Sequence, residues 1–234
     1  ASLYVTDEVR FRSCVNAIKA NGMRAVIYTS NSLSNNDRMW DTYADPWLIE
    51  PRGMPFIPAN RPKERSFQAC PRSEFFTYFV YRIGKLLDTY DLDGIFFDGR
   101  SYATCNNRQH GCGVRNFEGV EVPERNIWSG RERQLLLYHT VKQRNAYAEA
   151  HKSGNWDAPV CYLWDAAWEG EQFMSTVRGN QKRLDICPLE AMRAQMNGLP
   201  YGLPTRFTAY NYAPFTPVEN ATLAFVHGTT SAMT

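Results

Sequence analysis

The chain has 234 residues, of which 44% are hydrophobic and 14% aromatic. This is enough apolar surface for one large domain or two small ones, and it argues against a disordered chain. Lysine and arginine number 26 against 24 acidic residues, so no strong net field would attract nucleic acid or an anionic membrane surface. No stretch approaches the roughly 20 apolar residues that a membrane-spanning helix needs.

The first predicted elements are a helix and a strand. Residues 7–21 carry apolar side chains at helical spacing, with Thr6 or Asp7 as the expected N-cap and Asn21-Gly22 as the stop. Residues 23–28 then predict a strand, which runs into a polar segment. The side chains expected to face the core from the helix are Val9, Cys14, Val15 and Ile18.

Residues 31–72 predict a long irregular loop, because six prolines interrupt any regular element. Its aromatic content argues against disorder, since large aromatic side chains tend to bury surface. An ordered loop that covers a binding face is the preferred interpretation. The aromatic residues concerned are Trp40, Tyr43, Trp47 and Phe56.

The clearest helix is predicted at residues 73–90, with Ser73 as its cap and a stripe of apolar side chains along one face. A strand at 94–98 follows. A second helix is predicted at 129–150 and a second strand at 159–165. The last third continues the alternation more weakly, with a helix at 188–196, a strand at 206–212 and a helix at 218–226.

Strands separated by helices imply parallel pairing through right-handed crossovers, so the predicted fold class is α/β. No glycine-rich phosphate-binding motif follows any strand, which argues against a nucleotide-binding sheet. A TIM-like (β/α) barrel is therefore predicted, as a single domain over residues 1–234. The units number fewer than eight, which leaves open an incomplete barrel from a longer protein, with upstream strands absent from this chain.

Two of the predicted strands end in an aspartate. Asp98 and Gly99 close the run Tyr90-Asp-Leu-Asp-Gly-Ile-Phe-Phe-Asp-Gly99, and Asp165 closes the next strand. Because active sites of (β/α) barrels lie at the carboxyl ends of the strands, both carboxylates are expected on one rim. The alternative for Asp98 is a local role, in which its side chain caps the following turn.

Glu169 and Glu171 follow Asp165, and in extended chain they share a side, which would turn one of them toward the pocket beside Asp98. Two carboxylates on one rim are the minimum equipment for glycoside hydrolysis, one as acid and the other as nucleophile or base. Asp98 and Glu171 are predicted as the essential pair. Asp165 is predicted to orient one of them or a sugar hydroxyl. The sequence does not assign acid and base within the pair.

Aromatic and polar side chains near the strand ends are candidate sugar contacts. Flat rings suit sugars, although such aromatics more often serve as packing. His110 and His151 are within reach of the rim, whereas His139 falls in a helix pattern. No Gly-x-Ser-x-Gly elbow supports a serine nucleophile. The predicted substrate-binding residues are Tyr28, Arg100, Tyr102, His110, Trp164, Trp168 and Glu169.

Six cysteines, at positions 14, 70, 105, 112, 161 and 187, have irregular spacing and do not fix a redox compartment. Cys105 and Cys112 flank a short polar loop, which fits a loop-closing disulfide or free thiols. A metal site with His110 is less favoured, because structural zinc normally has paired cysteine spacing and the chain has no Cys-x-x-Cys. No metal and no cofactor are therefore predicted.

Four blocks, in order along the chain, carry a resemblance to one group of proteins. They are Asn21-Gly-Met-Arg-Ala-Val-Ile-Tyr-Thr-Ser30, Tyr90 to Gly99, Asn107-Arg-Gln-His-Gly-Cys-Gly113, and Asp165 to Glu171. Together they resemble the glycoside-hydrolase-like barrel proteins related to glycoside hydrolase family 123. The resemblance implies a TIM-like barrel that acts on polysaccharides or glycans, commonly in exported bacterial enzymes, and hence a secreted or periplasmic location.

Family 123 is known for β-N-acetylgalactosaminidases that use an adjacent Asp-Glu pair, assisted by the substrate's acetamido group. The adjacent pair here is Asp7-Glu8, at an expected helix start where the dipole favours acids, so the family's catalytic pair is not carried over. The predicted function is a glycoside hydrolase with a carbohydrate substrate. The alternatives are a non-catalytic carbohydrate-binding barrel and a structural or assembly protein built on a barrel remnant. Sugar, linkage and oligomeric state are not predicted.

Overall fold

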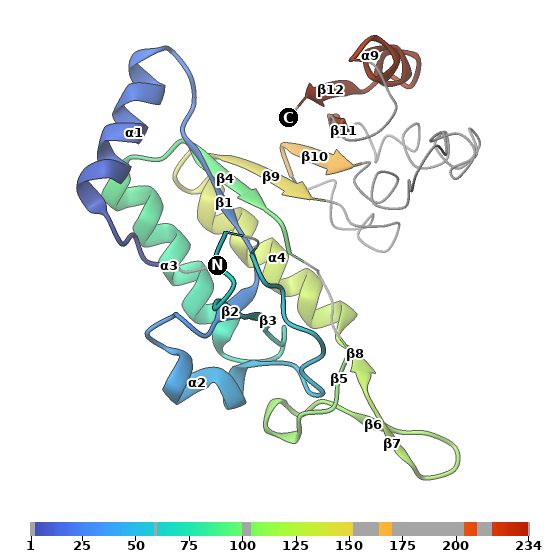
Figure 1. Cartoon of the computed structure of the whole chain (residues 1–234). Coiled ribbons are helices and arrows are strands. Elements are labelled where there is room, and N and C mark those ends of the chain that lie inside the picture. The colour runs from blue at the N-terminus through green and yellow to red at the C-terminus, as the bar shows by residue number, and fades with distance from the viewer. Residues whose placement is uncertain are drawn as a thin grey trace. The chain divides into compact units, whose positions relative to one another are not determined.

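The structure is a computed structural model that describes residues 3–58, 60–99, 104–151, 164–169, 204–209 and 217–233. The chain divides into two compact units, Ala1–Tyr147 and Ala148–Thr234, which we describe one at a time. Helices alternate with parallel strands in the first unit, and the described residues of the second unit are parallel strands with one helix between the last two (Figure 1). Within the described ranges, every helix is too short or too polar to cross a membrane.

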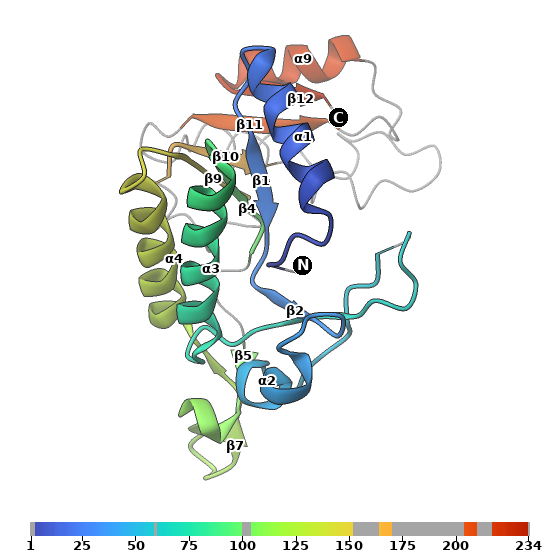
Figure 2. The ribbon, with the colours of Figure 1, turned by 90° about the vertical axis from the view of Figure 1, so that its left-hand side faces the viewer.

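The first unit is built on two parallel strands with helices against one face. β1 (Val26–Thr29) pairs with β4 (Gly94–Phe97), and the register sets Tyr28 beside Phe96. α3 (Phe75–Tyr90) packs on this pair, and α4 (Ile127–Lys142) runs alongside α3 (Figures 1 and 2). The expected strand at 94–98 and helix at 73–90 are confirmed to within two residues.

α3 contributes heavily to the core of this unit, because nine of its sixteen residues are buried along one stripe. Phe79 is fully buried, and its ring lies 5.9 Å from that of Phe97 on β4. Burial of one such side chain stabilises the fold by about 1.5–3 kcal/mol. Ser73 is not the cap that was expected. Its hydroxyl donates instead to the carbonyl oxygens of Trp47 and Cys70.

α1 (Glu8–Ala20) begins as predicted, because the Asp7 side chain accepts a hydrogen bond from the Arg10 amide at 2.9 Å. The expected core face is only partly right. Val15 is buried, whereas Val9 is 83% exposed. The helix is attached mainly by longer side chains, with Phe11 edge-on to Tyr90 and Lys19 paired with Asp91 and Asp93.

Residues 31–72 are more regular than expected. β2 (Ser32–Ser34) pairs antiparallel with β3 (Ser66–Gln68), and α2 (Trp40–Trp47) lies between them in the chain. The prolines misled the prediction, since α2 continues through Pro46 to its last residue. The indole of Trp47 is buried and stacks on Tyr43, with ring centroids 4.4 Å apart. Aromatic burial of this kind offsets the hydrogen bond that a proline removes.

The segment between β4 and α4 forms two small hairpin-like ladders. β5 (Thr104–Cys105) pairs with β8 (Glu124–Arg125), and β6 (Val114–Arg115) pairs with β7 (Glu121–Val122). A single turn of 3₁₀-helix, η1 (Arg108–His110), lies between β5 and β6. Figures 1 and 2 both show this segment at the end of the unit beyond α4.

The helix predicted at 129–150 ends early, at Lys142. Asn145 takes the left-handed conformation, with φ of 54°, and the chain resumes as β9 (Tyr147–His151). This strand was missed, because alanine and glutamate in its sequence also suit a helix. His139 does lie on α4, as its spacing indicated.

The second unit is a run of parallel strands. β9 pairs with β10 (Ala166–Glu169), β10 with β11 (Thr205–Ala209), and β11 with β12 (Thr230–Met233). α9 (Pro217–Val226) connects β11 to β12 and packs on both. The strand at 206–212 and the helix at 218–226 are thus confirmed with shifted boundaries, and the helix expected at 188–196 lies outside the described residues.

Candidate active site

Asp98 follows β4 directly, and its amide donates to the Thr29 carbonyl oxygen at 2.8 Å, which continues the pairing with β1. Successive side chains of a strand point to opposite faces. Because Phe97 packs against Phe79 of α3, Phe96 and Asp98 belong to the face away from that helix. Asp98 is therefore at the carboxyl end of β4, on the face that the helix leaves open.

Tyr28 reaches Asp98 from the neighbouring strand. Its ring lies beside Phe96, with centroids 5.7 Å apart, and its hydroxyl donates a hydrogen bond to Asp98 Oδ2. The side chain is 58% exposed, so much of the ring is open to a ligand. Two residues predicted from the sequence are thus brought together here.

The turn after Asp98 requires glycine for steric reasons. A Cβ on Gly99 would lie 2.3 Å from the Phe97 ring and 2.9 Å from Asn31 Oδ1. The backbone therefore approaches Asn31, a buried polar residue that follows β1. Sequence reasoning did not single out Asn31, although the polar run Thr29-Ser-Asn-Ser32 at a strand end was visible.

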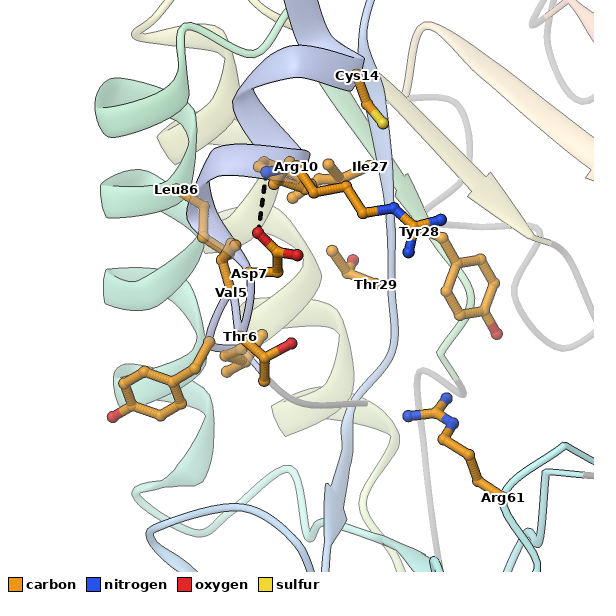
Figure 3. A pocket seen from close by; sticks show the side chains of 13 residues that line it. Val5, Thr6, Asp7, Arg10, Cys14, Ile27, Tyr28, Thr29, Arg61 and Leu86 are labelled. Atoms are coloured by element: carbon orange, nitrogen blue, oxygen red, sulfur yellow. Dashed lines mark hydrogen bonds between the residues drawn. The ribbon is translucent and has the colours of Figure 1, made fainter.

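A pocket of about 660 Å³ adjoins Tyr28, between the start of α1, β1 and the loop that carries Arg61 (Figure 3). Pockets for small organic ligands span roughly 300–1,000 Å³. In Figure 3 the guanidinium of Arg10 extends from α1 toward Tyr28, and that of Arg61 lies below the Tyr28 ring in this view. Thr6 and Thr29 add hydroxyl groups to the lining. The wall is rich in donors, which suits a hydroxylated ligand, and its arginines were not anticipated.

Asp165 does not lie at the carboxyl end of a strand, so the expectation for this residue was wrong. β10 begins at Ala166, so Asp165 precedes the strand. Its Oδ2 accepts the Ala148 amide at 2.9 Å, while its own amide donates to the Ala148 carbonyl oxygen at 2.9 Å. Asp93, one residue before β4, accepts the Ala25 amide at 2.8 Å in the same way. Both aspartates secure the amino ends of their strands.

Polar and aromatic side chains of the second unit lie at neighbouring positions on β9, β10 and β11. The register sets Trp168 beside His151 on one side and Arg206 on the other, and the His151 and Trp168 rings are 5.7 Å apart. Glu149, two residues before His151, is buried and pairs with Arg206 at 3.1 Å. Glu149 and Arg206 were missed, because β9 was read as helix. Trp164, a predicted sugar contact, is 3% exposed and therefore packs inside.

Several predicted site residues lie outside what the structure describes. These are Arg100, Tyr102 and Glu171, together with the side chain of Glu169, whose backbone ends β10. The pairing of Asp98 with Glu171 therefore stays a prediction.

His110 faces the protein instead of a ligand. Its Nε2 lies 2.6 Å from the Pro46 carbonyl oxygen and its Nδ1 3.7 Å from Cys105 Sγ, so both ring nitrogens have partners and a role as sugar contact is not supported. Cys105 and Cys112 are free thiols, not the disulfide considered above. The Cys70 thiol, then the backbone amides of Asn107 and Glu50, donate hydrogen bonds to Cys105 Sγ and hold the pKa of Cys105 below that of an ordinary thiol.

The parallel strands, joined through helices, have the architecture of a (β/α) barrel, and solved structures share it. The chain superposes on a maltogenic α-amylase, AmyB, from Thermotoga neapolitana with a TM-score of 0.59 at 11% identity, covering 99% of this chain and 52% of that one. For α-L-fucosidase isoenzyme 2 from Paenibacillus thiaminolyticus the TM-score is 0.62 at 15% identity, over 97% and 36% of the two chains. The fold is thus the TIM-like barrel of glycoside hydrolases.

A third similar structure is Ega3 of Aspergillus fumigatus in complex with galactosamine, with a TM-score of 0.53 at 13% identity over 99% of this chain and 81% of that one. The chain thus spans about half the length of the amylase and about a third of the fucosidase. No protein-family model matches the sequence, and no curated protein matches it either. At these identities the similarity is one of fold.

Proposed function

We propose that the chain is a glycoside hydrolase that cleaves glycosidic bonds of a polysaccharide or glycan by carboxylate chemistry. The observation that carries this proposal is the hydrogen bond from Tyr28 to Asp98 at the carboxyl end of β4, where barrel enzymes place their catalytic groups. The adjoining pocket and the fold shared with an amylase and a fucosidase support it. We also propose that the chain is related to glycoside hydrolase family 123, as its four sequence blocks suggest, and that residues 1–234 form one barrel domain. A secreted or periplasmic location follows from the same resemblance.

Asp98 is assigned as the ionised carboxylate, which acts as nucleophile or base. A phenolic hydroxyl that donates to a carboxylate stabilises its negative charge. The acid is assigned to Glu171, on sequence grounds alone. Asp165 is removed from the catalytic group and given a positioning role in its sheet, because it precedes β10. Tyr102 and Arg100 stay proposed sugar contacts.

The test is hydrolysis of polysaccharides and aryl glycosides, including N-acetylgalactosaminides, measured as released reducing ends or aglycone. Asp98→Asn and Glu171→Gln should each lower the rate about 100-fold or more, since each removes a group that transfers a proton or forms a bond. Asp91→Asn is the matched control, because Asp91 lies seven residues earlier, is exposed and binds Lys19. Melting curves of all variants establish that the fold is intact.

Two further measurements separate the roles. Tyr28→Phe should lower the rate about 10- to 100-fold, the worth of a hydrogen bond to a charged group. In Asp98→Ala, added azide should restore release from an activated aryl glycoside if Asp98 is a nucleophile. Wild-type rates in both amide variants would exclude the assignment. Retention of the protein on one glycan without any release would instead favour the non-catalytic binding barrel.

A further inference from the structure

Three cysteines and a histidine from distant parts of the chain meet in the interior of the first unit. Cys70 lies between β3 and α3, whereas Cys105, His110 and Cys112 belong to the segment between β4 and α4. Their sulfur atoms and the nearest ring nitrogen all lie within 4.8 Å of one another. All three thiols are fully buried and His110 is 9% exposed. Within the described residues, this is the group of side chains best matched to a metal ion.

Two separations within the cluster are close to those of a tetrahedral zinc site. With zinc–sulfur bonds of about 2.3 Å, tetrahedral geometry places two sulfur ligands about 3.8 Å apart, and a sulfur and a nitrogen slightly closer. Cys70 Sγ lies 3.6 Å from Cys112 Sγ, and Cys105 Sγ lies 3.7 Å from His110 Nδ1. These two separations fit a bound ion, and the other separations within the group are at most 4.8 Å.

The surroundings of the cluster hold the ligands in the form that a metal needs. His110 Nε2 donates to the Pro46 carbonyl oxygen, which leaves the Nδ1 lone pair directed at the cysteines. The backbone amides of Glu50 and Asn107 both donate to Cys105 Sγ at 3.4 Å. Asn126 Nδ2 lies 3.4 Å from Cys112 Sγ and 3.7 Å from Cys70 Sγ. Donors on sulfur stabilise thiolates.

The local sequence brings His110 and Cys112 together. Two residues apart, they face one centre because Gly111 between them takes the left-handed conformation, with φ of 68°, and ends η1. Gly113, with φ of 94°, turns the chain away again. Side chains with a Cβ rarely adopt these conformations, so the His-Gly-Cys-Gly order suits a tight ligand-bearing turn.

We propose that Cys70, Cys105, His110 and Cys112 bind one zinc ion in a closed structural site. Three thiolates and an imidazole are a ligand set that zinc prefers, and four protein ligands leave no open position for catalysis. A divalent cation would neutralise the negative charge of the thiolates that it binds.

The ion would cross-link the two long connections that follow β1 and β4. Cys70 ends the first connection just before α3, and the other three ligands lie in the second. Both connections start at the carboxyl ends of their strands, where Asp98 and Asn31 lie. The site therefore secures the loops beside the candidate active site without touching the reacting groups, and its existence does not depend on the proposed enzyme activity.

The experiment measures metal bound to the full chain, purified with a thiol-free reductant and without chelator. Elemental analysis should find one zinc per chain, and Co²⁺ added after zinc removal should give the visible bands of tetrahedral thiolate coordination. Cys112→Ser should lose the zinc, whereas Cys14→Ser should keep it, because Cys14 is an exposed thiol on α1. Zinc removal should lower the melting temperature of the wild type and of Cys14→Ser alike.

The wild-type measurements decide the matter even if Cys112→Ser does not fold. A protein that carries no zinc and takes up neither Zn²⁺ nor Co²⁺ overturns the proposal. So does a Cys70–Cys112 disulfide, found as a linked peptide pair in a digest of unreduced protein, and so does stoichiometric iron. Zinc that is equally bound by Cys112→Ser would place the ion elsewhere.

Discussion

Replacing Gly99 by alanine tests how tightly the turn after Asp98 is packed. The new Cβ would lie 2.3 Å and 2.7 Å from two atoms of the Phe97 ring and 2.9 Å from Asn31 Oδ1. These separations are about 0.6–1.7 Å below the 3.5–4.0 Å at which carbon atoms are in favourable contact. Phe97 is 1% exposed and packs against Phe79, so the ring has little room to move.

Overpacking of a well-packed core costs about 1–3 kcal/mol. For a chain of this size, each kcal/mol lowers the melting temperature by about 2–4 °C, so Gly99→Ala should melt about 2–12 °C below the wild type. Thermal and urea unfolding, followed by circular dichroism, measure the change. If the backbone moves instead of the ring, Asp98 moves with it, and the variant loses activity as well as stability.

A second substitution identifies the atoms responsible. Phe97→Leu removes the ring that the new Cβ meets, so it should cost less in the Gly99→Ala background than in the wild type, by about 1 kcal/mol or more. A Gly99→Ala variant as stable as the wild type would refute the reasoning. Strict additivity of the two substitutions would refute the assignment of the clash to Phe97.

Two further predictions concern charged groups. Asp165→Ala and Asp93→Ala should each lower the free energy of unfolding by about 1.5–3 kcal/mol, because each variant loses a hydrogen bond to a carboxylate. Asp165→Asn should keep the wild-type turnover if the role of Asp165 is positional. Loss of turnover in Asp165→Asn at full stability would contradict that role. The hydrogen bonds from Arg144 hold the pKa of Asp88 below its usual value. The pair therefore stabilises the fold at pH values above the unfolded pKa of about 3.9, and this stabilisation is lost as the pH falls through the lower pKa of the folded state. Because Asp88 is exposed, Asp88→Asn should lower the free energy of unfolding by up to about 1 kcal/mol at pH 7 and leave it unchanged in strong acid, as measured by urea unfolding. A loss of stability independent of pH would refute this prediction.

The part of the fold around Asp98 was predictable because its signals are strong and local. The stripe on α3 and the apolar run of β4 each follow one period without interruption, and the structure confirms both. β9 was not predictable in this way. Its sequence, Tyr147-Ala-Glu-Ala-His151, carries two alanines and a glutamate, which are good helix formers, and α4 ends at Lys142 without a glycine or proline to mark the stop.

The candidate site was predictable as single residues but not as an arrangement. Asp98 could be found because a carboxylate ends a buried strand, whereas its partner Tyr28 is 70 residues away and reaches it only through the register of β1 and β4. Asp165 was misplaced because the sequence did not show that β10 begins after this residue. The same pattern, an aspartate before an apolar run, was already present at Asp93. Cys70 is 35 residues from Cys105, too far for a spacing rule to join them.

The sparse burial of α1 has a consequence for the pocket beside Tyr28. α1 buries only Val15 among its thirteen residues, whereas α3 buries nine of sixteen. Segments with few buried apolar contacts open with small free energies, independently of global unfolding. One wall of the 660 Å³ pocket therefore belongs to a helix with few buried contacts, whereas α3, which packs on β4, is buried along a whole face. The volume available to a ligand is thus a property of a local equilibrium between closed and opened α1, and a bulky ligand would shift that equilibrium at little cost to the rest of the fold.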